Sequence, residues 1–369
     1  MLVAFRHSGH RCPGLRPQSP FAFDIIKYST MSPISTDKPP VTVPSLKEEF
    51  QSMLSGAGIY ALESRAKLAL TGSDRVRWLN GMMTNNVRDL AQGHGVYGFL
   101  LNPQGKILGD LYAYQRGDSL LLDTDQSQVT KILELFDHYI IMDDVEVANV
   151  TDKLVSCGIY GPGAYKLLRV SGIDVPELQP LQFAELTGSD FTVTVVRGDN
   201  PLVDSYEIWS DAPNFEVVAR RTVEAGITPI SANTLELLRI ASGIPKYGQD
   251  VREKDLPQET EQARALNFNK GCYIGQEIVE RIRSRGSVHR KFTGFTVQGS
   301  LPAPGTRIEL DGKEVGEVTS SAVLPTSDGA HGVALGYIRR EHAIPGKTLQ
   351  ADDAKLSVAD LPFRTILKH

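Results

Sequence analysis

The chain has 369 residues, of which 41% are hydrophobic and 22% are charged, a composition typical of folded proteins that excludes disorder throughout. The formal net charge of −5 gives no general attraction to nucleic acid or to anionic membranes. No stretch approaches the roughly 18 uninterrupted apolar residues of a membrane helix, so no membrane association is expected. The three cysteines lie far apart without a Cys-x-x-Cys pair, which fits a reducing compartment and argues against a closed zinc site.

The first 43 residues are expected to lie outside the folded part. Residues 1–30 carry four basic side chains against the single acid Asp24, as in a weak transit peptide, but two prolines and a glycine in 13–17 interrupt any amphipathic helix there. We prefer a mis-assigned start, with translation beginning at Met31 and a flexible lead rich in Ser, Thr and Pro up to residue 43. This interpretation favours a bacterial cytoplasmic protein, with the mitochondrial matrix as the alternative.

From residue 44 to about 290, strands interrupted by single helices are expected. In chain order they are a helix at 46–55, strands at 58–62 and 66–71, a helix between 73 and 84, a hairpin of 97–101 and 107–115, a strand at 119–123, a helix at 126–141, strands at 145–149 and 154–160, and a helix after 161–163. This order predicts an α+β fold rather than a doubly wound parallel sheet.

From residue 286 onward the pattern changes to short alternating segments. They lie at 293–297, 307–310, 315–319 and 333–337 and are separated by Pro and Gly turns, which predicts a small C-terminal β-barrel. We therefore divide the chain into a lead (1–43), an α+β region (44–290) and a barrel (291–369).

The most specific motif is the octapeptide Lys270-Gly271-Cys272-Tyr273-Ile274-Gly275-Gln276-Glu277. The apolar residues after it, Ile278, Val279 and Ile282, are spaced as on one face of a helix. A cysteine beside a lysine at a helix N-terminus is expected to have a lowered pKa, and its thiolate attacks electrophiles or binds metal. The alternative is a small buried cysteine on a packed turn.

The octapeptide resembles the signature of the YgfZ family, folate-binding relatives of the glycine-cleavage T-protein that support iron–sulfur proteins and tRNA modification. Further segments match this superfamily in the same order, namely 105–111, 206–208, Arg239 with 247–250, and 315–320. The likeness spans roughly residues 60–364. It implies two T-protein-like folate-binding α+β subdomains around a central cleft and a C-terminal barrel.

The resemblance also implies site residues. Glu207 matches the pterin-binding glutamate, and Tyr97, Asp110 and Arg239 match positions that line the folate cleft. Cys272 stands where the T-protein has an aspartate, whereas Asp110 lines up with its catalytic aspartate. By pattern alone, Glu207 is an exposed strand carboxylate, Arg239 lies on a helix surface, and Asp110 faces either solvent or a cleft.

The resemblance implies the leading function, and two alternatives are kept beside it. The leading one is a tetrahydrofolate-binding accessory protein for the assembly or repair of iron–sulfur enzymes, in which Cys272 acts without a resident metal site and ligates a cluster only transiently. Its partners are iron–sulfur enzymes or cluster-assembly proteins. The second is a folate-dependent aminomethyltransferase or demethylase that uses Asp110, and the third is a non-catalytic module that docks client proteins. Whether the protein turns over a substrate is left open.

A run of basic residues follows the octapeptide, with no acid among them: Arg281, Arg283, Arg285, Arg290 and Lys291. It could bind the polyglutamate tail of folate, an RNA phosphate or an acidic partner. A solvated helix face explains it equally well.

Overall fold

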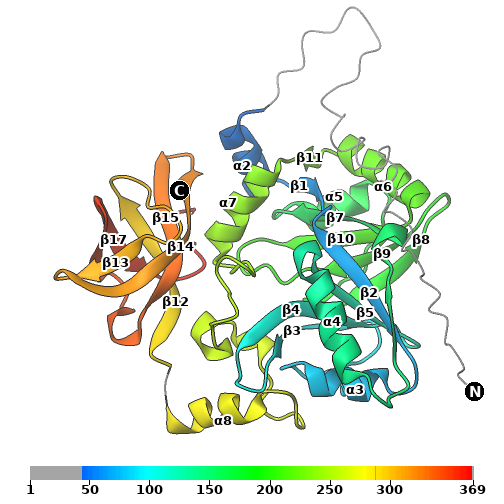
Figure 1. Ribbon diagram of the computed structural model, residues 1–369. Coiled ribbons are helices and arrows are strands. Elements are labelled where there is room, and N and C mark those ends of the chain that lie inside the picture. The colour runs from blue at the N-terminus through cyan, green and yellow to red at the C-terminus, as the bar shows by residue number, and fades with distance from the viewer. Residues whose placement is uncertain (1–43, 287, 368–369) are drawn as a thin grey trace, which may run out of the picture.

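A computed structural model describes residues 44–286 and 288–367, which form two sheets with their helices and a separate barrel (Figure 1). The α+β class with a small C-terminal β-barrel is therefore confirmed. The proposed start at Met31 and the flexible lead at 1–43 lie outside the described residues. Within those residues, no helix is long and apolar enough to cross a membrane.

The first sheet has five antiparallel strands in the order β3-β4-β5-β2-β6. They are β2 (Arg65–Thr71), β3 (Gly95–Leu101), β4 (Ile107–Gln115), β5 (Leu120–Asp125) and β6 (Glu146–Asn149). Helices α3 (Arg75–Met82) and α4 (Val129–Tyr139) share an apolar core with this sheet, where Trp78 packs edge-on against Phe136 with 5.0 Å between ring centroids. The hairpin expected from the sequence is β3–β4.

The second sheet has six strands in the order β11-β1-β7-β10-β9-β8. They are β1 (Gly58–Ala61), β7 (Val155–Tyr160), β8 (Phe183–Thr187), β9 (Thr192–Arg197), β10 (Ser205–Ser210) and β11 (Thr228–Pro229), and only the β1–β11 pair is parallel. Helices α5 (Ala164–Val170) and α6 (Ala212–Glu224) pack on it through a second apolar core.

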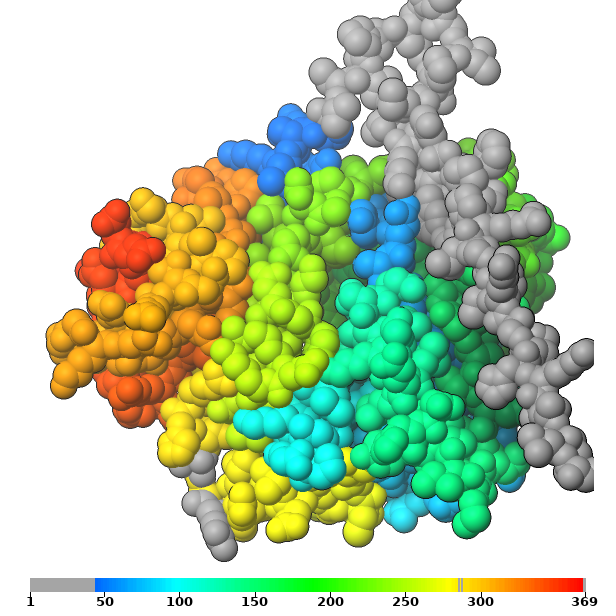
Figure 2. Space-filling view, in the orientation of Figure 1, coloured from blue at the N-terminus to red at the C-terminus, as the bar shows by residue number. Residues whose placement is uncertain are grey.

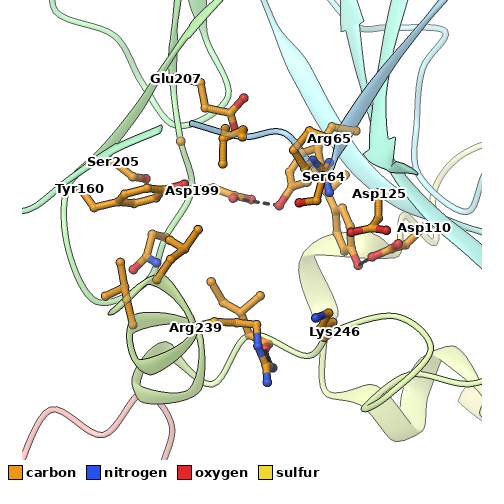
Figure 3. Close-up of a pocket in the computed structure, with 18 of the residues that line it drawn as sticks. Ser64, Arg65, Asp110, Asp125, Tyr160, Asp199, Ser205, Glu207, Arg239 and Lys246 are labelled. Carbon is orange, nitrogen blue, oxygen red and sulfur yellow. Dashed lines mark hydrogen bonds between the residues drawn. The ribbon is translucent and has the colours of Figure 1, made fainter. Parts of the chain in front are cut away.

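The two sheets meet through a small apolar cluster in which Tyr114 and Leu121 from the first sheet contact Val196 and Trp209 from the second. Next to this cluster the sheets separate, and side chains from β4 and β10 face a shared cavity (Figure 3). The cavity therefore exists only because two sheets from different parts of the sequence are brought face to face.

The barrel closes in the order β12-β15-β14-β13-β16-β17. Its strands are β12 (Arg290–Gln298), β13 (Arg307–Leu310), β14 (Lys313–Pro325), β15 (Ala330–Arg339), β16 (Thr348–Ala351) and β17 (Ala354–Ala359), around an interior that includes Phe295, Val318 and Leu356. Closure leaves no unpaired strand edge, which small β-domains otherwise have to protect. Figure 2 shows the barrel packed directly against helix α7 (Ala232–Ser242), drawn in yellow-green.

Three further helices connect these parts: α2 (Leu46–Ser55), α7 (Ala232–Ser242) and α8 (Gln276–Arg285). Single 3₁₀ turns occur at Gln126–Gln128, Thr151–Lys153, Pro257–Thr260, Ala263–Ala265 and Arg340–His342. Helices α2 and α7 share an apolar core with the barrel strands β14 and β15. The buried Glu49 carboxylate of α2 accepts hydrogen bonds from the Ser231 N–H and hydroxyl and from the Thr234 hydroxyl, which fixes the start of α7.

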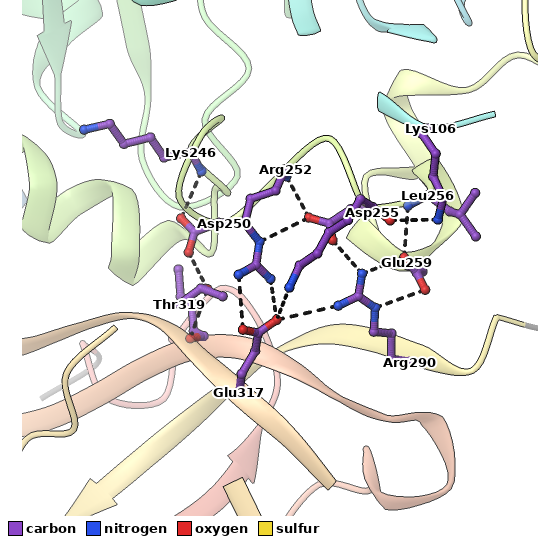
Figure 4. A network of polar contacts seen from close by, with 12 residues as sticks. Lys106, Lys246, Asp250, Arg252, Asp255, Leu256, Glu259, Arg290, Glu317 and Thr319 are labelled. Atoms are coloured by element: carbon purple, nitrogen blue, oxygen red, sulfur yellow. Dashed lines mark hydrogen bonds and ion pairs between the residues drawn. The ribbon is translucent and has the colours of Figure 1, made fainter. Parts of the chain in front are cut away.

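A polar network joins the barrel to the segment between α7 and α8 (Figure 4). Asp255, which is fully buried, accepts hydrogen bonds from the Arg252 N–H at 2.7 Å and from Arg290 Nη2 at 2.5 Å. Glu317 of β14 accepts two hydrogen bonds from Arg252 and lies 3.6 Å from Arg290 Nη1. Arg290 also donates to Glu259. The network therefore ties β12 and β14 to one loop.

Asp255→Asn is expected to destabilise the protein, because it leaves the Arg290 guanidinium without one of its charged partners in a buried setting. The free energy of unfolding should fall by roughly 3 kcal/mol, as measured by urea denaturation. Glu314→Gln is the matched control, since the Glu314–Arg307 pair is exposed at 3.3 Å and should contribute less than about 1 kcal/mol. Equal small losses in both variants would contradict a structural role for the network.

Candidate functional site

The cavity between the two sheets has a volume of about 410 Å³, within the range of roughly 300 to 1,000 Å³ that small-molecule sites occupy. Tyrosines supply much of its wall, namely Tyr60, Tyr97, Tyr112, Tyr114, Tyr160, Tyr206 and Tyr247. The four residues expected to line a ligand cleft, Tyr97, Asp110, Glu207 and Arg239, all line this one cavity. Cys272 does not.

Glu207 lies on β10, where the next residue, Ile208, faces the apolar core and Glu207 faces the cavity. The Trp209 indole N–H donates to Glu207 Oε2 at 2.8 Å, and Lys67 Nζ lies 3.7 Å from the same oxygen. Burial raises the pKa of Glu207, and the Lys67 charge acts in the opposite direction. Glu207 therefore presents to the cavity a carboxyl group whose position is held by Trp209 and Lys67.

A buried set of charges supports Glu207, and no sequence pattern predicts it. Lys67 is 1% exposed and lies 3.0 Å from Asp123 Oδ1 and 4.2 Å from the centroid of the Trp209 ring. Arg65 Nε also donates to Asp123 at 3.0 Å. Burial raises the pKa of Asp123, but Arg65 and Lys67 reverse this effect and the pKa lies below its usual value.

Asp110 lies on β4 and faces the cavity, which answers the question that strand alternation left open. The Tyr97 hydroxyl donates to Asp110 Oδ2 at 2.7 Å, and Gln128 Nε2 donates to Oδ1 at 2.7 Å. Burial raises the pKa of Tyr97 well above its usual value, so its phenol remains a donor. The carboxyl group is thus held in one orientation at the cavity wall.

Arg239 lines the cavity, yet its hydrogen-bonding capacity is used inside the protein. Its five N–H groups donate to both oxygens of Glu236, to the Ile244 carbonyl, to Asp250 and to the Ser320 hydroxyl. It therefore has no donor left for a ligand. We replace its expected role in ligand binding by one in positioning the cavity wall.

Arg264 is a further residue that the sequence analysis missed. Its guanidinium lies 4.5 Å from the centroid of the Tyr97 ring and is paired with Asp199. Arg264 and Asp199 line both this cavity and a second one of about 530 Å³ between the α+β part and the barrel. The ion pair therefore forms part of the partition between the two cavities.

Cys272 lies exposed in the loop before α8, so the alternative of a buried cysteine is wrong. The helix begins at Gln276, four residues later, so the thiol lies outside its first turn. The ammonium of Lys270, expected beside the thiol, instead donates to the carbonyl oxygens of Asn80, Met83 and Asn85. The charge that was expected to activate the thiol is therefore used elsewhere.

Most residues of the octapeptide hold the loop before α8 against the rest of the protein. Burial lowers the pKa of Lys270 to about 7, while its three carbonyl acceptors favour the charged form. Gly275 has φ +83°, and a side chain there would place its Cβ 2.6 Å from the Asn102 carbonyl oxygen. Tyr273 is buried, and Gln276 accepts its N–H at 3.3 Å. Gly271, Cys272 and Glu277 remain exposed.

The basic run after the octapeptide does not form one surface. Arg290, the first residue of β12, belongs to the polar network with Asp255. Lys291 pairs with Glu261 at 3.0 Å. The Arg283 guanidinium lies 4.5 Å from the centroid of the Phe268 ring. Of the members of the run whose side chains the structure describes, Arg281, Arg283, Arg290 and Lys291, none lines the cavity between the sheets. In residues 44–286 and 288–367, no three His, Cys, Asp or Glu side chains are grouped to hold a metal ion.

Lys270→Met is expected to destabilise the loop that carries Cys272, because three buried carbonyl groups lose their donor. The free energy of unfolding should fall by roughly 3 kcal/mol in urea denaturation, and limited proteolysis should cut the loop at 266–275 faster. The exposed Lys47→Met serves as control and should behave as wild type. A change below about 1 kcal/mol with unaltered proteolysis would contradict an anchoring role.

Comparison with known proteins gives relatives over most of the chain. The GCVT N-terminal domain model matches residues 26–270, and the CAF17 C-terminal beta-barrel domain model matches residues 289–362. The chain is similar to the aminomethyltransferase of Rubrobacter xylanophilus, at 28% identity over 80% of each chain, and to that of Halothermothrix orenii, at 26% identity over 84% of this chain and 88% of the relative.

The same fold occurs in the crystal structure of glycine cleavage system aminomethyltransferase T from Bartonella henselae. The TM-score is 0.77 at 22% identity, over 88% of this chain and 91% of that one. The sequence match to the GCVT N-terminal domain covers more than half of the 369 residues. The protein therefore belongs to the GCVT N-terminal domain family and carries a CAF17-type barrel at its C-terminus.

Proposed function

We propose that the protein binds tetrahydrofolate, or a derivative of it, in the cavity between the sheets and supports the assembly or repair of iron–sulfur enzymes through Cys272. The observation that carries the proposal is the meeting of Glu207, Asp110 and Tyr97 in one tyrosine-walled cavity. The exposed thiol within a YgfZ-like octapeptide supports its second part.

The cavity fits a reduced folate in chemistry and in size. A pterin ring has an amino group and a ring N–H side by side, and the Glu207 carboxylate can accept both hydrogen bonds. Aromatic rings such as Tyr112 and Tyr160 offer flat apolar walls for the pterin and benzoyl groups. When bound, tetrahydrofolate would supply a carrier for a one-carbon group. Asp110, fixed by Tyr97 and Gln128, would hold or accept a proton beside it.

Cys272 acts on a different surface, since it is exposed and does not line the cavity. A thiolate is a soft ligand that suits iron and clusters, and it also takes part in thiol exchange. One cysteine cannot complete a cluster site, so the other ligands would come from an iron–sulfur enzyme or a cluster-assembly protein. Accessibility is the property that such a transient contact requires.

A folate-dependent one-carbon transferase is the second candidate. The oriented Asp110 carboxyl group at the cavity wall favours it, as does similarity to aminomethyltransferases. In that reaction, Asp110 would accept or position the proton at the folate nitrogen.

Glu207→Gln should weaken binding of tetrahydrofolate about 10- to 100-fold, because the amide offers one acceptor and no charge to the pterin edge. Isothermal titration calorimetry at neutral pH measures the change. Glu185→Gln is the control, since Glu185 is an exposed carboxylate on β8 outside the cavity. Binding that is unchanged by Glu207→Gln would contradict a pterin site at Glu207.

Cys272→Ser should reduce iron–sulfur enzyme activity to the level of cells that lack the gene, when it is expressed in those cells in place of the wild type. Asp110→Asn should restore activity, because the proposed support depends on the thiol rather than on proton transfer in the cavity. Cys157→Ala is the control for loss of a cysteine, since Cys157 is buried in the second sheet.

The opposite pattern, rescue by Cys272→Ser and failure of Asp110→Asn, would reject the thiol-centred function. Turnover of an aminomethyl donor that is lost in Asp110→Asn would then establish the transferase.

A further inference from the structure

The cationic side chains around the cavity differ in whether they are already paired with an acidic side chain of the protein. Four line it, and three of them are arginines held by acidic side chains of the protein. Arg65 pairs with Asp123, Arg264 with Asp199, and Arg239 with Glu236 and Asp250. These ion pairs fix the walls and leave little charge for a ligand.

Lys246 is the exception. Its backbone N–H donates to Asp250 Oδ2 at 3.0 Å, which anchors the residue at the end of the turn after α7. Its ammonium group has no acceptor and no acidic partner among the residues that the structure describes, and its side chain is exposed. Figure 4 shows the side chain leading away from the polar network, and Figure 3 places it at the cavity.

Glu207 and Lys246 lie on opposite sides of the cavity (Figure 3). A ligand that fits both must have hydrogen-bond donors at one end and a negative charge at the other. Reduced folate has this polarity, with its pterin amino group at one end and the carboxylates of its glutamate at the other.

We propose that Lys246 binds the glutamate carboxylate of folate, so that the protein selects folates that carry a glutamate over pterins that lack one. This inference rests on the proposed folate site. It assigns the recognition of the tail to Lys246. The cavity-lining Arg239 cannot take this part, because its five donors are all used.

Two other paths for the tail fit the structure less well. The second cavity is lined by three carboxylates, Asp199, Glu261 and Asp360, and its two cations are each paired within the protein, Arg264 with Asp199 and Lys291 with Glu261. An anionic tail would be repelled there. The basic side chains of α8 and β12 that the structure describes do not line the folate cavity.

The test compares 5-formyltetrahydrofolate with 5-formyltetrahydropteroate, which is the same ligand without its glutamate. Calorimetry should show that the wild type binds the glutamate-bearing ligand about three- to tenfold more tightly, because a single partly exposed charge pair contributes at this level. Lys246→Met should abolish the preference and leave binding of 5-formyltetrahydropteroate unchanged. Lys246→Arg should retain the preference. In the wild type and in this variant, the preference for the glutamate-bearing ligand should weaken as salt is added.

Lys166→Met is the matched control, since Lys166 is an exposed lysine of α5 away from the cavity. Its ligand preference should equal that of the wild type. A preference that survives Lys246→Met, or equal binding of both ligands by the wild type, overturns the role of Lys246 while the folate site stands. Failure of the wild type to bind either ligand overturns the folate site and this inference together.

Discussion

One buried carboxylate holds the parts of this protein together. Asp250 is fully buried and accepts hydrogen bonds from Arg239 on α7, from the Lys246 N–H, and from the hydroxyl groups of Thr319 and Ser320 on the barrel. A buried charge is tolerated only when it is fully paired and hydrogen-bonded, so these four groups cannot drift apart cheaply. The part of the cavity wall that Arg239 and Lys246 form is therefore held in position by contact with the barrel. A ligand would meet a wall that is already ordered.

The opposite wall depends on a second set of buried charges. Lys67 and Arg65 share Asp123, and Lys67 also faces Glu207 and the Trp209 ring. Their mutual attraction offsets the cost of removing each charge from water, and it keeps the Glu207 carboxyl group in place before any ligand arrives. Binding groups that are held in advance lose less conformational entropy when a ligand binds.

The exposed thiol and the cavity lie on different surfaces, but one hairpin connects them. Strands β3 and β4 carry Tyr97 and Asp110 into the cavity, and the turn between them packs against the start of α8. Contacts there are close: a Cβ on Gly105 would lie 2.8 Å from the Ile278 side chain. A ligand that shifted the hairpin would therefore also move the loop that carries Cys272.

Much of the secondary structure of this protein could be predicted from its sequence. Alternating apolar residues and Gly or Pro turns predicted the β3–β4 hairpin and four barrel strands, because local patterns decide which backbone conformation forms. The octapeptide pointed to the family. The remaining properties depended on contacts between distant segments. A lysine in an apolar strand, such as Lys67, is expected to face solvent. Strand pairing within the first sheet places it opposite Asp123, and the meeting of the two sheets packs Trp209 against it.

Contacts between distant segments also decide which side chains of the candidate site are free. The family resemblance, and not the residue pattern, placed Asp110 and Glu207 at a cleft, and whether a charge is free depends on its neighbours in space. Arg239 has no free donor because Asp250 and Ser320 reach it from later segments, and the Lys270 ammonium is turned away from Cys272 by carbonyl groups near residue 83. The sequence determined which groups were present, and the tertiary structure decided which of them were still available to a ligand, because hydrogen bonds and charges are matched across the fold and not along the chain.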